Sequence, residues 1–140
     1  MIEAVLTLAE ARWILQSAEL PPDDLSPLAE PLQAVPEVPA GSPAETQVTE
    51  GLRKKGLLDG EGRPNPFVAT ALEWLATPER VVALALLGPG GSEMAHLAQR
   101  GDACVECRRS TDALRLRFPI PAAEAADWLA LRDGGGRHAG

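Results

Sequence analysis

Two cysteines three positions apart are the residues of this sequence best placed to do chemistry. Cys104 and Cys107 form a Cys-x-x-Cys motif, which can serve as half of a zinc site or as a redox pair. A structural zinc site needs about four ligands, and only His96 and His138 remain as histidine candidates. A redox pair normally opens a helix, whereas residues 103–110 read as a strand. Side chains three apart on a strand point to opposite faces, so we expect one buried cysteine, one surface cysteine and no metal.

The other candidate groups for catalysis lack the partners that their chemistry needs. His96 would need a nucleophile or an orienting carboxylate nearby to act as a general base, and no sequence feature supplies one. The run 88–91, Gly-Pro-Gly-Gly, resembles a phosphate-binding loop. Its Pro89 lacks a backbone N–H donor, however, and no Lys-Ser/Thr pair follows. We therefore expect no catalytic residue, no cofactor and no small-molecule substrate, and we predict that the protein is not an enzyme.

Charge and hydropathy narrow the class of partner. The formal net charge of −7 argues against nucleic acid, because phosphate neutralisation by a basic face supplies most of that affinity. The basic spots at 53–55 and 108–109 are short, and no aromatic residue interleaves with them. No apolar run approaches the roughly 20 residues that span a bilayer, and residues 1–20 contain acidic side chains without a basic leader. These features predict a cytoplasmic protein that does not bind membranes.

Helix signals dominate the first half of the chain. Thr7 and Glu10 form a capping-box pattern that opens a helix up to the prolines at 21–22, and residues 2–6 suit a short strand before it. Residues 21–43 contain seven prolines, so they predict a loop with one short helix. A second helix is expected over 44–55, ended by three cations and Gly56. A third is expected from Asn65 and Pro66 to residue 76.

The second half reads as strands with short connections. Residues 80–87, 93–99, 103–110 and 113–118 each suit a strand, although 93–99 also fits a helix. Residues 121–132 then suit a final amphipathic helix. The fold class is therefore α+β, an antiparallel β-meander of about four strands with helices packed on one face. We expect a single domain over residues 1–133 and a flexible tail at 134–140.

The first of these strands is apolar on both faces, which indicates a protein partner. Val81, Ala83, Ala85 and Leu87 alternate with three further apolar residues. A domain of this size with few helices does not readily cover both faces of such a strand. We expect another protein or a second copy of the chain to bind there, with Arg115 and Arg117 of the last strand added to the partner-binding surface.

One stretch of the chain is similar to a known family. The run 55–59, Lys-Gly-Leu-Leu-Asp, is followed by Gly-Arg at 62–63 and by 71–79, Ala-Leu-Glu-Trp-Leu-Ala-Thr-Pro-Glu, before the strands begin. This order resembles the EspG family, cytosolic chaperones of type VII (ESX) secretion in actinobacteria. The resemblance implies mixed α/β subdomains that recognise a helical pair of PE and PPE proteins. It covers one of the family's two related subdomains, and no family binding residue is carried over to a position here.

The leading hypothesis is a non-catalytic protein-binding adaptor of the secretion-chaperone kind. Two alternatives stay open. One is a winged-helix-like DNA-binding regulator, centred on the cations at 53–55 at the end of the second helix. The other is a small metal or thiol protein that uses Cys104 and Cys107.

Overall fold

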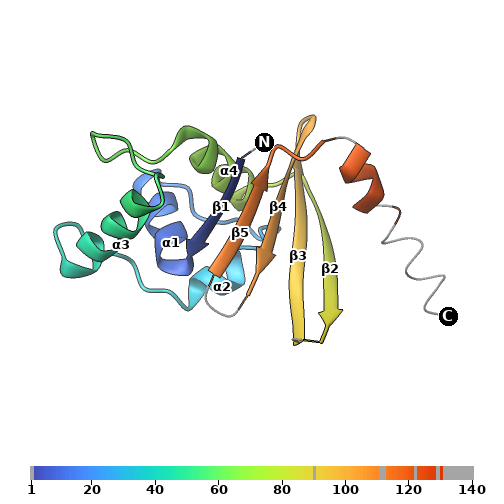
Figure 1. Cartoon of the computed structure of the whole chain (residues 1–140), viewed down its shortest axis with the longest axis horizontal. Coiled ribbons are helices and arrows are strands. Elements are labelled where there is room, and N and C mark those ends of the chain that lie inside the picture. Colours follow the sequence, from blue (N-terminus) through green and yellow to red (C-terminus); the bar gives the residue numbers. More distant parts are fainter. Residues whose placement is uncertain (1, 90, 111–112, 122, 129, 131–140) are drawn as a thin grey trace.

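The computed structural model describes residues 2–89, 91–110, 113–121, 123–128 and 130. The predicted tail at 134–140 lies outside the described residues. One antiparallel sheet is covered by helices on one face and by a short C-terminal helix at 123–128 on the other (Figure 1). The elements are β1 (Ile2–Thr7), α1 (Leu8–Ser17), α2 (Ala29–Gln33), α3 (Pro43–Lys54), α4 (Pro66–Ala76), β2 (Arg80–Gly88), β3 (Gly91–Arg100), β4 (Ala103–Arg109) and β5 (Ala113–Phe118).

The strands follow the order β1-β5-β4-β3-β2, and every neighbouring pair is antiparallel. The α+β class and the meander β2-β3-β4-β5 predicted from the sequence are confirmed. The sheet gains a fifth strand because residues 2–7 alternate, with Ala4 and Leu6 buried against the helices and Val5 exposed. This strand pairs with β5 from Ile2 opposite Phe118 to Thr7 opposite Ala113. As a result β1 and β2 form the two edges.

The helix boundaries follow the capping residues. The predicted capping box is present at α1, where the Glu10 N–H donates to the Thr7 hydroxyl at 3.1 Å and the Thr7 N–H donates to Glu10 Oε1 at 2.8 Å. At α4 the Asn65 side chain accepts the N–H groups of Phe67 and Val68, and Pro66 takes the first helical position. Local sequence therefore determines where these helices begin.

The carboxylate of Glu10 also joins two helices. Although charged, it is only 3 % exposed, and it accepts a hydrogen bond from Lys55 Nζ beyond the end of α3. Gly51 of α3 lies directly against it, because a Cβ at that position would come within 2.5 Å of Glu10 Oε2. The absence of a side chain at Gly51 thus allows α3 to approach α1.

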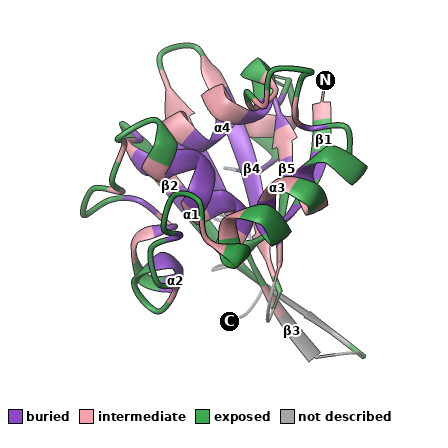
Figure 2. Cartoon of the chain, turned by 90° about the vertical axis from the view of Figure 1, so that its left-hand side faces the viewer, coloured by how far each residue is buried: buried purple, intermediate pink, exposed green. Residues whose placement is uncertain are grey.

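The main core lies between the helices and the sheet (Figure 2). Helix α4 packs across β1, β5, β4 and β3, and α1 packs on α3 and α4. Trp74 of α4 meets Phe118 of β5 edge-to-face, with ring centroids 5.0 Å apart. Leucines provide most of the largest fully buried side chains here, as the low aromatic content leads one to expect. They include Leu6, Leu28, Leu32, Leu52, Leu72, Leu75, Leu114 and Leu116.

The proline-rich segment 21–43 is fixed to the domain by polar as well as apolar contacts. The side-chain amide of Gln16 donates to the Val38 carbonyl at 2.7 Å and accepts the Val38 N–H at 2.9 Å. The hydroxyl of Ser26 donates to the Leu75 carbonyl at 2.6 Å. Leu28 and Leu32 are buried on either side of the start of α2. The segment 21–43 is therefore held against the domain at several points along its length.

The second face of the sheet carries its own small core. Ile120 and Trp128 cover Leu97 and Cys104 there, whereas Cys107 belongs to the main core on the helical face. The two thiols do point to opposite faces, as the strand offset predicts. The expectation of one surface cysteine is wrong, because the C-terminal segment covers the second face and leaves Cys104 only 8 % exposed.

Candidate functional site: an apolar groove on the β2–β3 hairpin

The β2–β3 hairpin projects past the layer of helices (Figure 1). Its register is unbroken over nine residue pairs, from Arg80 opposite Gln99 to Gly88 opposite Gly91. Strand β4 pairs with β3 only from Met94 onward. The outer part of the hairpin therefore extends beyond the region of the sheet that α4 covers.

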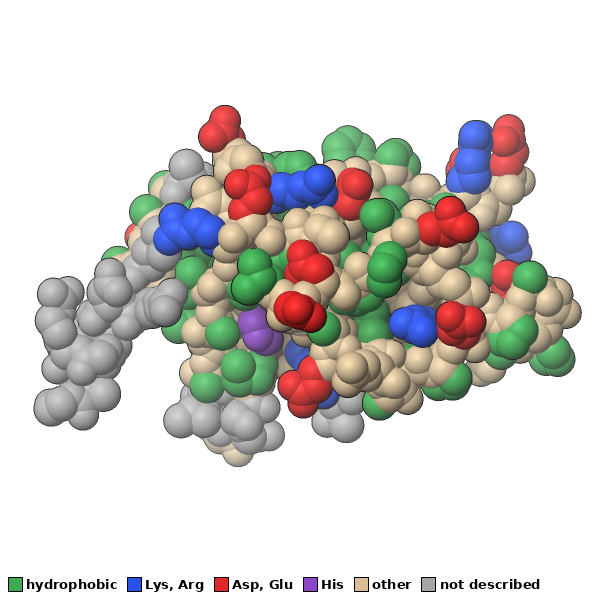
Figure 3. Space-filling view, turned by 180° about the vertical axis from the view of Figure 1, so that it is seen from behind, with side chains coloured by type: hydrophobic (Ala, Val, Ile, Leu, Met, Phe, Trp, Pro, Cys, Tyr) green, Lys and Arg blue, Asp and Glu red, His purple; other side chains and the backbone are tan. Residues whose placement is uncertain are grey.

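A groove of about 390 Å³ lies where the hairpin leaves the helical layer. Its floor is the helical face of β2 and β3, and its other wall is the segment just before and within α2. The lining residues are Leu25, Ser26, Pro27, Glu30, Pro31, Val81, Ala83, Met94, His96 and Arg109. Hydrophobic side chains gather around a histidine on this side of the molecule (Figure 3). The groove thus combines apolar side chains from both walls with polar groups that make up a comparable part of its surface.

Two exposed hydrophobic side chains mark this groove. Leu25 is 61 % exposed and Met94 is 40 % exposed, and both line it from opposite sides. A flexible thioether and a leucine that face each other across a hollow suit the binding of another apolar surface. Ala83 and Ala85 are also exposed on the same face of β2, so small side chains leave the floor open.

The polar groups of the groove determine its charge. Burial, and then the charge of neighbouring Arg109, lower the pKa of His96 below its ordinary value of 6.5. His96 is therefore neutral near pH 7, and Arg109 supplies the positive charge in this wall. Glu30 lies on the α2 side. An incoming surface would meet an apolar floor flanked by one cation and one carboxylate.

The depressed pKa of His96 leads to a prediction about stability. The imidazole of His96 binds a proton more readily in the unfolded chain than in the folded chain. Protonation of His96 therefore does not affect stability above pH 6.5, and it lowers the free energy of unfolding as the pH falls below that value. Urea unfolding at a series of pH values is expected to show this acid-side decrease, and His96→Gln is expected to make it shallower. An unchanged pH dependence in the variant would contradict the assignment of this decrease in stability to His96.

The predicted partner-binding residues lie on two different faces. The register places Val81, Ala83 and Ala85 on the helical face of β2, and the side chain of Leu87 lies outside what the structure describes. Val81 packs against the edge of the main core, and Ala83 lines the groove. Arg115 and Arg117 lie on the second face, opposite Arg108 and Glu106 of β4. The structure therefore does not bring the two arginines together with the β2 residues.

Arg117 takes part in an ion network on the second face. Its guanidinium donates to Glu106 and to Glu124 of the C-terminal segment, and Arg108 Nε donates to Glu106 at 3.0 Å. The hydrogen bond with Glu106 is the main cause that raises the pKa of Arg117. Glu106 is only 1 % exposed. Arg117 thus connects the sheet to the segment that covers it, whereas Arg115 is exposed.

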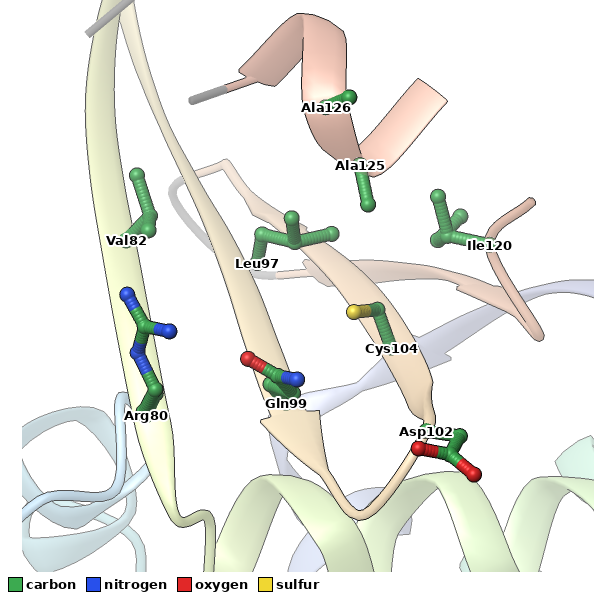
Figure 4. Close-up of a pocket in the computed structure, with 9 residues that line it drawn as sticks. All are labelled: Arg80, Val82, Leu97, Gln99, Asp102, Cys104, Ile120, Ala125 and Ala126. Carbon is green, nitrogen blue, oxygen red and sulfur yellow. The ribbon is translucent and has the colours of Figure 1, made fainter. Parts of the chain in front are cut away.

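A second cavity of about 280 Å³ lies between this C-terminal segment and the sheet (Figure 4). Val82, Leu97, Cys104 and Ile120 surround its apolar part, with Ala125 above them. Arg80, Gln99 and Asp102 lie at the end away from the helix. The sheet therefore has hollows on both faces, and the chain's own C-terminal segment covers this one.

The thiols do not supply chemistry to either hollow in their present state. Burial raises the pKa of Cys104, and burial with the Glu106 charge raises that of Cys107 to about 12. Both thiols are therefore protonated near neutral pH, whereas a cysteine that acts as a nucleophile or binds a metal must be a thiolate. Within the described ranges, no three His, Cys, Asp or Glu side chains are grouped so as to hold a metal ion.

The sequence did not reveal the wall of the groove opposite β2. The apolar strand identified the floor, but the wall comes from the proline-rich segment some 50 residues earlier, at Leu25, Pro27 and Pro31. Met94 was assigned to a strand without a functional role. Leu25, an apolar residue between prolines, was the only sequence signal that could have indicated this wall. Its position beside Met94 depends on the tertiary fold.

The fold and its groove define an α+β scaffold suited to binding another protein's surface. The chain belongs to the EspG family, whose model matches residues 7–131. The structure is similar to that of the type VII secretion system chaperone EspG5 of Mycobacterium tuberculosis, solved in complex with a PE25–PPE41 dimer. The TM-score is 0.59 at 21 % identity, over 95 % of this chain and 51 % of that one.

The chain thus spans about half the length of that chaperone, and the likeness concerns the fold. No curated protein matches the chain in sequence. The segment between α3 and α4 contains a single isolated bridge, Leu58 to Pro64, and does not form the strand pair of a wing within the residues described. No described helix is long and apolar enough to cross a membrane.

Proposed function

We propose that this chain is a non-catalytic adaptor of the secretion-chaperone kind, which binds a helical PE–PPE protein pair. Membership of the EspG family supports this function. The structure of EspG5 in complex with a PE25–PPE41 dimer supports the class of partner. The single structural observation that carries the proposal is the open groove on the β2–β3 hairpin, where the apolar side chains of Leu25 and Met94 are exposed on its two sides.

The partner surface that fits this groove is a helix end with apolar side chains. Met94 and Leu25 would bury apolar area against it, at about 25 cal/mol per Å². Arg109 is positioned to receive a carboxylate or a helix C-terminus from the partner. Val81 and Ala83, two of the β2 residues that the sequence identified, line the floor of this groove. Ala85 is exposed on the same face of β2, and these three residues become part of the proposed site.

A pull-down and a titration test this proposal. The full chain is co-expressed with PE–PPE pairs from the same genome, and binding of a captured pair is measured by isothermal titration calorimetry. Met94→Asp is expected to raise the Kd about tenfold or more, because it places a charge in the apolar centre of the contact.

Phe67→Asp is the matched control, since Phe67 is also an exposed hydrophobic residue (58 %) but does not line the groove. Its Kd is expected to stay within a factor of two or so of the wild-type value. Equal losses in the two variants would place the binding surface elsewhere, and failure to capture any PE–PPE pair would remove the proposed partner class.

A further inference from the structure

The outer edge of β2 is an open strand without the features that normally prevent edge pairing. Within the described sheet β2 hydrogen-bonds only to β3. Its nine residues, Arg-Val-Val-Ala-Leu-Ala-Leu-Leu-Gly, include one charge and no proline, and the register with β3 contains no bulge. Natural sheets protect their edges with charged side chains, prolines, bulges or covering segments. A straight apolar edge of this length is suited to pairing with another strand.

The sequence of β2 is complementary to itself when two copies run antiparallel. With Leu84 on the axis, Ala83 of each copy lies opposite Ala85 of the other, and Val82 lies opposite Leu86. Odd-numbered residues of one copy lie opposite odd-numbered residues of the other, and even-numbered residues opposite even-numbered ones. The helical faces of the two sheets therefore remain on the same side. Arg80 then lies opposite Gly88, and the two arginines stay far apart. Small residues face small ones, and no like charges meet.

The charges beside the edge are compatible with this register. Arg80 and Glu93 both lie on the second face of the sheet, and neither forms an ion pair with any residue that the structure describes. Glu93 is opposite Leu86 in the hairpin. In the antiparallel pair Arg80 of one copy lies diagonally across from Glu93 of the other, within the combined reach of two long side chains. The twofold axis generates this pair twice.

We propose that a second copy of this chain pairs with the β2 edge, antiparallel and centred on Leu84, to form a continuous ten-stranded sheet. The interface is isologous, as in most homodimers. It uses the strand edge rather than the groove, so each copy keeps its own groove on the helical face. The proposal is independent of the identity of any secretion partner.

Sedimentation velocity of the full chain alone tests the interface, with no other protein present. The wild type is expected to shift from monomer to dimer as its concentration rises. Ala83→Lys with Ala85→Lys places lysines opposite lysines at the axis and is expected to give a monomer, as is Ala83→Glu with Ala85→Glu. An equimolar mixture of the two variants is expected to regain the dimer mass, because opposite charges then meet.

Both alanines are exposed, so the thermal unfolding midpoint by circular dichroism is expected to stay close to that of the wild type. A wild type that remains monomeric at every concentration overturns the proposal. So does a dimer that persists in both charged variants, or a mixture that fails to reassociate. Binding of PE–PPE pairs is measured separately with Met94→Asp. The homodimer and the PE–PPE complex can therefore each be disproved without affecting the other.

Discussion

Replacement of Arg117 by alanine is expected to lower the free energy of unfolding by about 3 kcal/mol, because it leaves the carboxylate of Glu106 buried with one partner instead of two. Glu106 is 1 % exposed, and only Arg108 would still donate to it. The same change removes the contact from the sheet to Glu124. Urea unfolding measures the loss in stability.

A second measurement shows where the structure opens. Ile120 and Trp128 cover Cys104, and Cys107 lies in the main core on the other face. Loss of the Arg117–Glu124 contact is expected to loosen the cover of Cys104 first, so that a thiol reagent modifies Cys104 faster while Cys107 stays protected. Modification is read by mass spectrometry after digestion.

Arg115→Ala is the matched control for Arg117. It removes the same kind of side chain two positions away on the same strand and the same face, but Arg115 is exposed. Its effect on stability is expected to stay within about 0.5 kcal/mol. Similar losses in the two variants, or equal modification of both cysteines, would show that the network does not hold the C-terminal segment.

The second large effect is expected at the contact between Glu10 and Gly51. Glu10→Ala is expected to cost about 2 kcal/mol, since it removes the reciprocal half of the capping box and leaves space beside α3. The ion pair with Lys55 adds little to this, because the Lys55 side chain is 35 % exposed. Thermal and urea unfolding measure the change.

The effect of Gly51→Ala on stability is expected to change sign when residue 10 is changed from glutamate to alanine. Beside Glu10 the added Cβ collides with a buried carboxylate that Thr7 and Lys55 hold in place, so the variant is expected to be destabilised. With alanine at position 10 the collision is gone, and the better helix propensity of alanine is expected to stabilise the double variant by about 1 kcal/mol relative to Glu10→Ala. A double-mutant cycle gives this coupling energy. Additive effects would show that Gly51 is not required for close approach.

Local signals in the sequence determined most of the elements. Thr7 with Glu10, Asn65 with Pro66, and Gly56 predicted helix ends that the structure confirms, because caps act over a few residues. The strand predicted over 113–118 is also present as β5, where Leu114, Leu116 and Phe118 are buried in alternation. These features depend on residues that are close in sequence.

What the sequence did not predict depends on contacts between distant segments. The strand pattern predicts that Cys104 and Cys107 lie on opposite faces of the sheet. It does not predict the burial of Cys104, because Ile120 and Trp128 of a later segment cover that residue. Arg117 was assigned to a binding surface, and its carboxylate partners became visible only when β4, β5 and the C-terminal segment met. The groove likewise needed two segments about 50 residues apart, one of them rich in proline.

The pairing of β1 with β5 has a consequence for how the chain folds as it is made. Ile2 lies opposite Phe118, so β1 must wait for the synthesis of β5, more than 100 residues later, before its backbone groups are paired with that strand. At about 5–20 residues per second, that interval lasts roughly 6–20 s. Contacts of such long sequence separation also slow folding itself. During that time the apolar side of β1, with Ala4 and Leu6, has only the helices to protect it from the wrong partner.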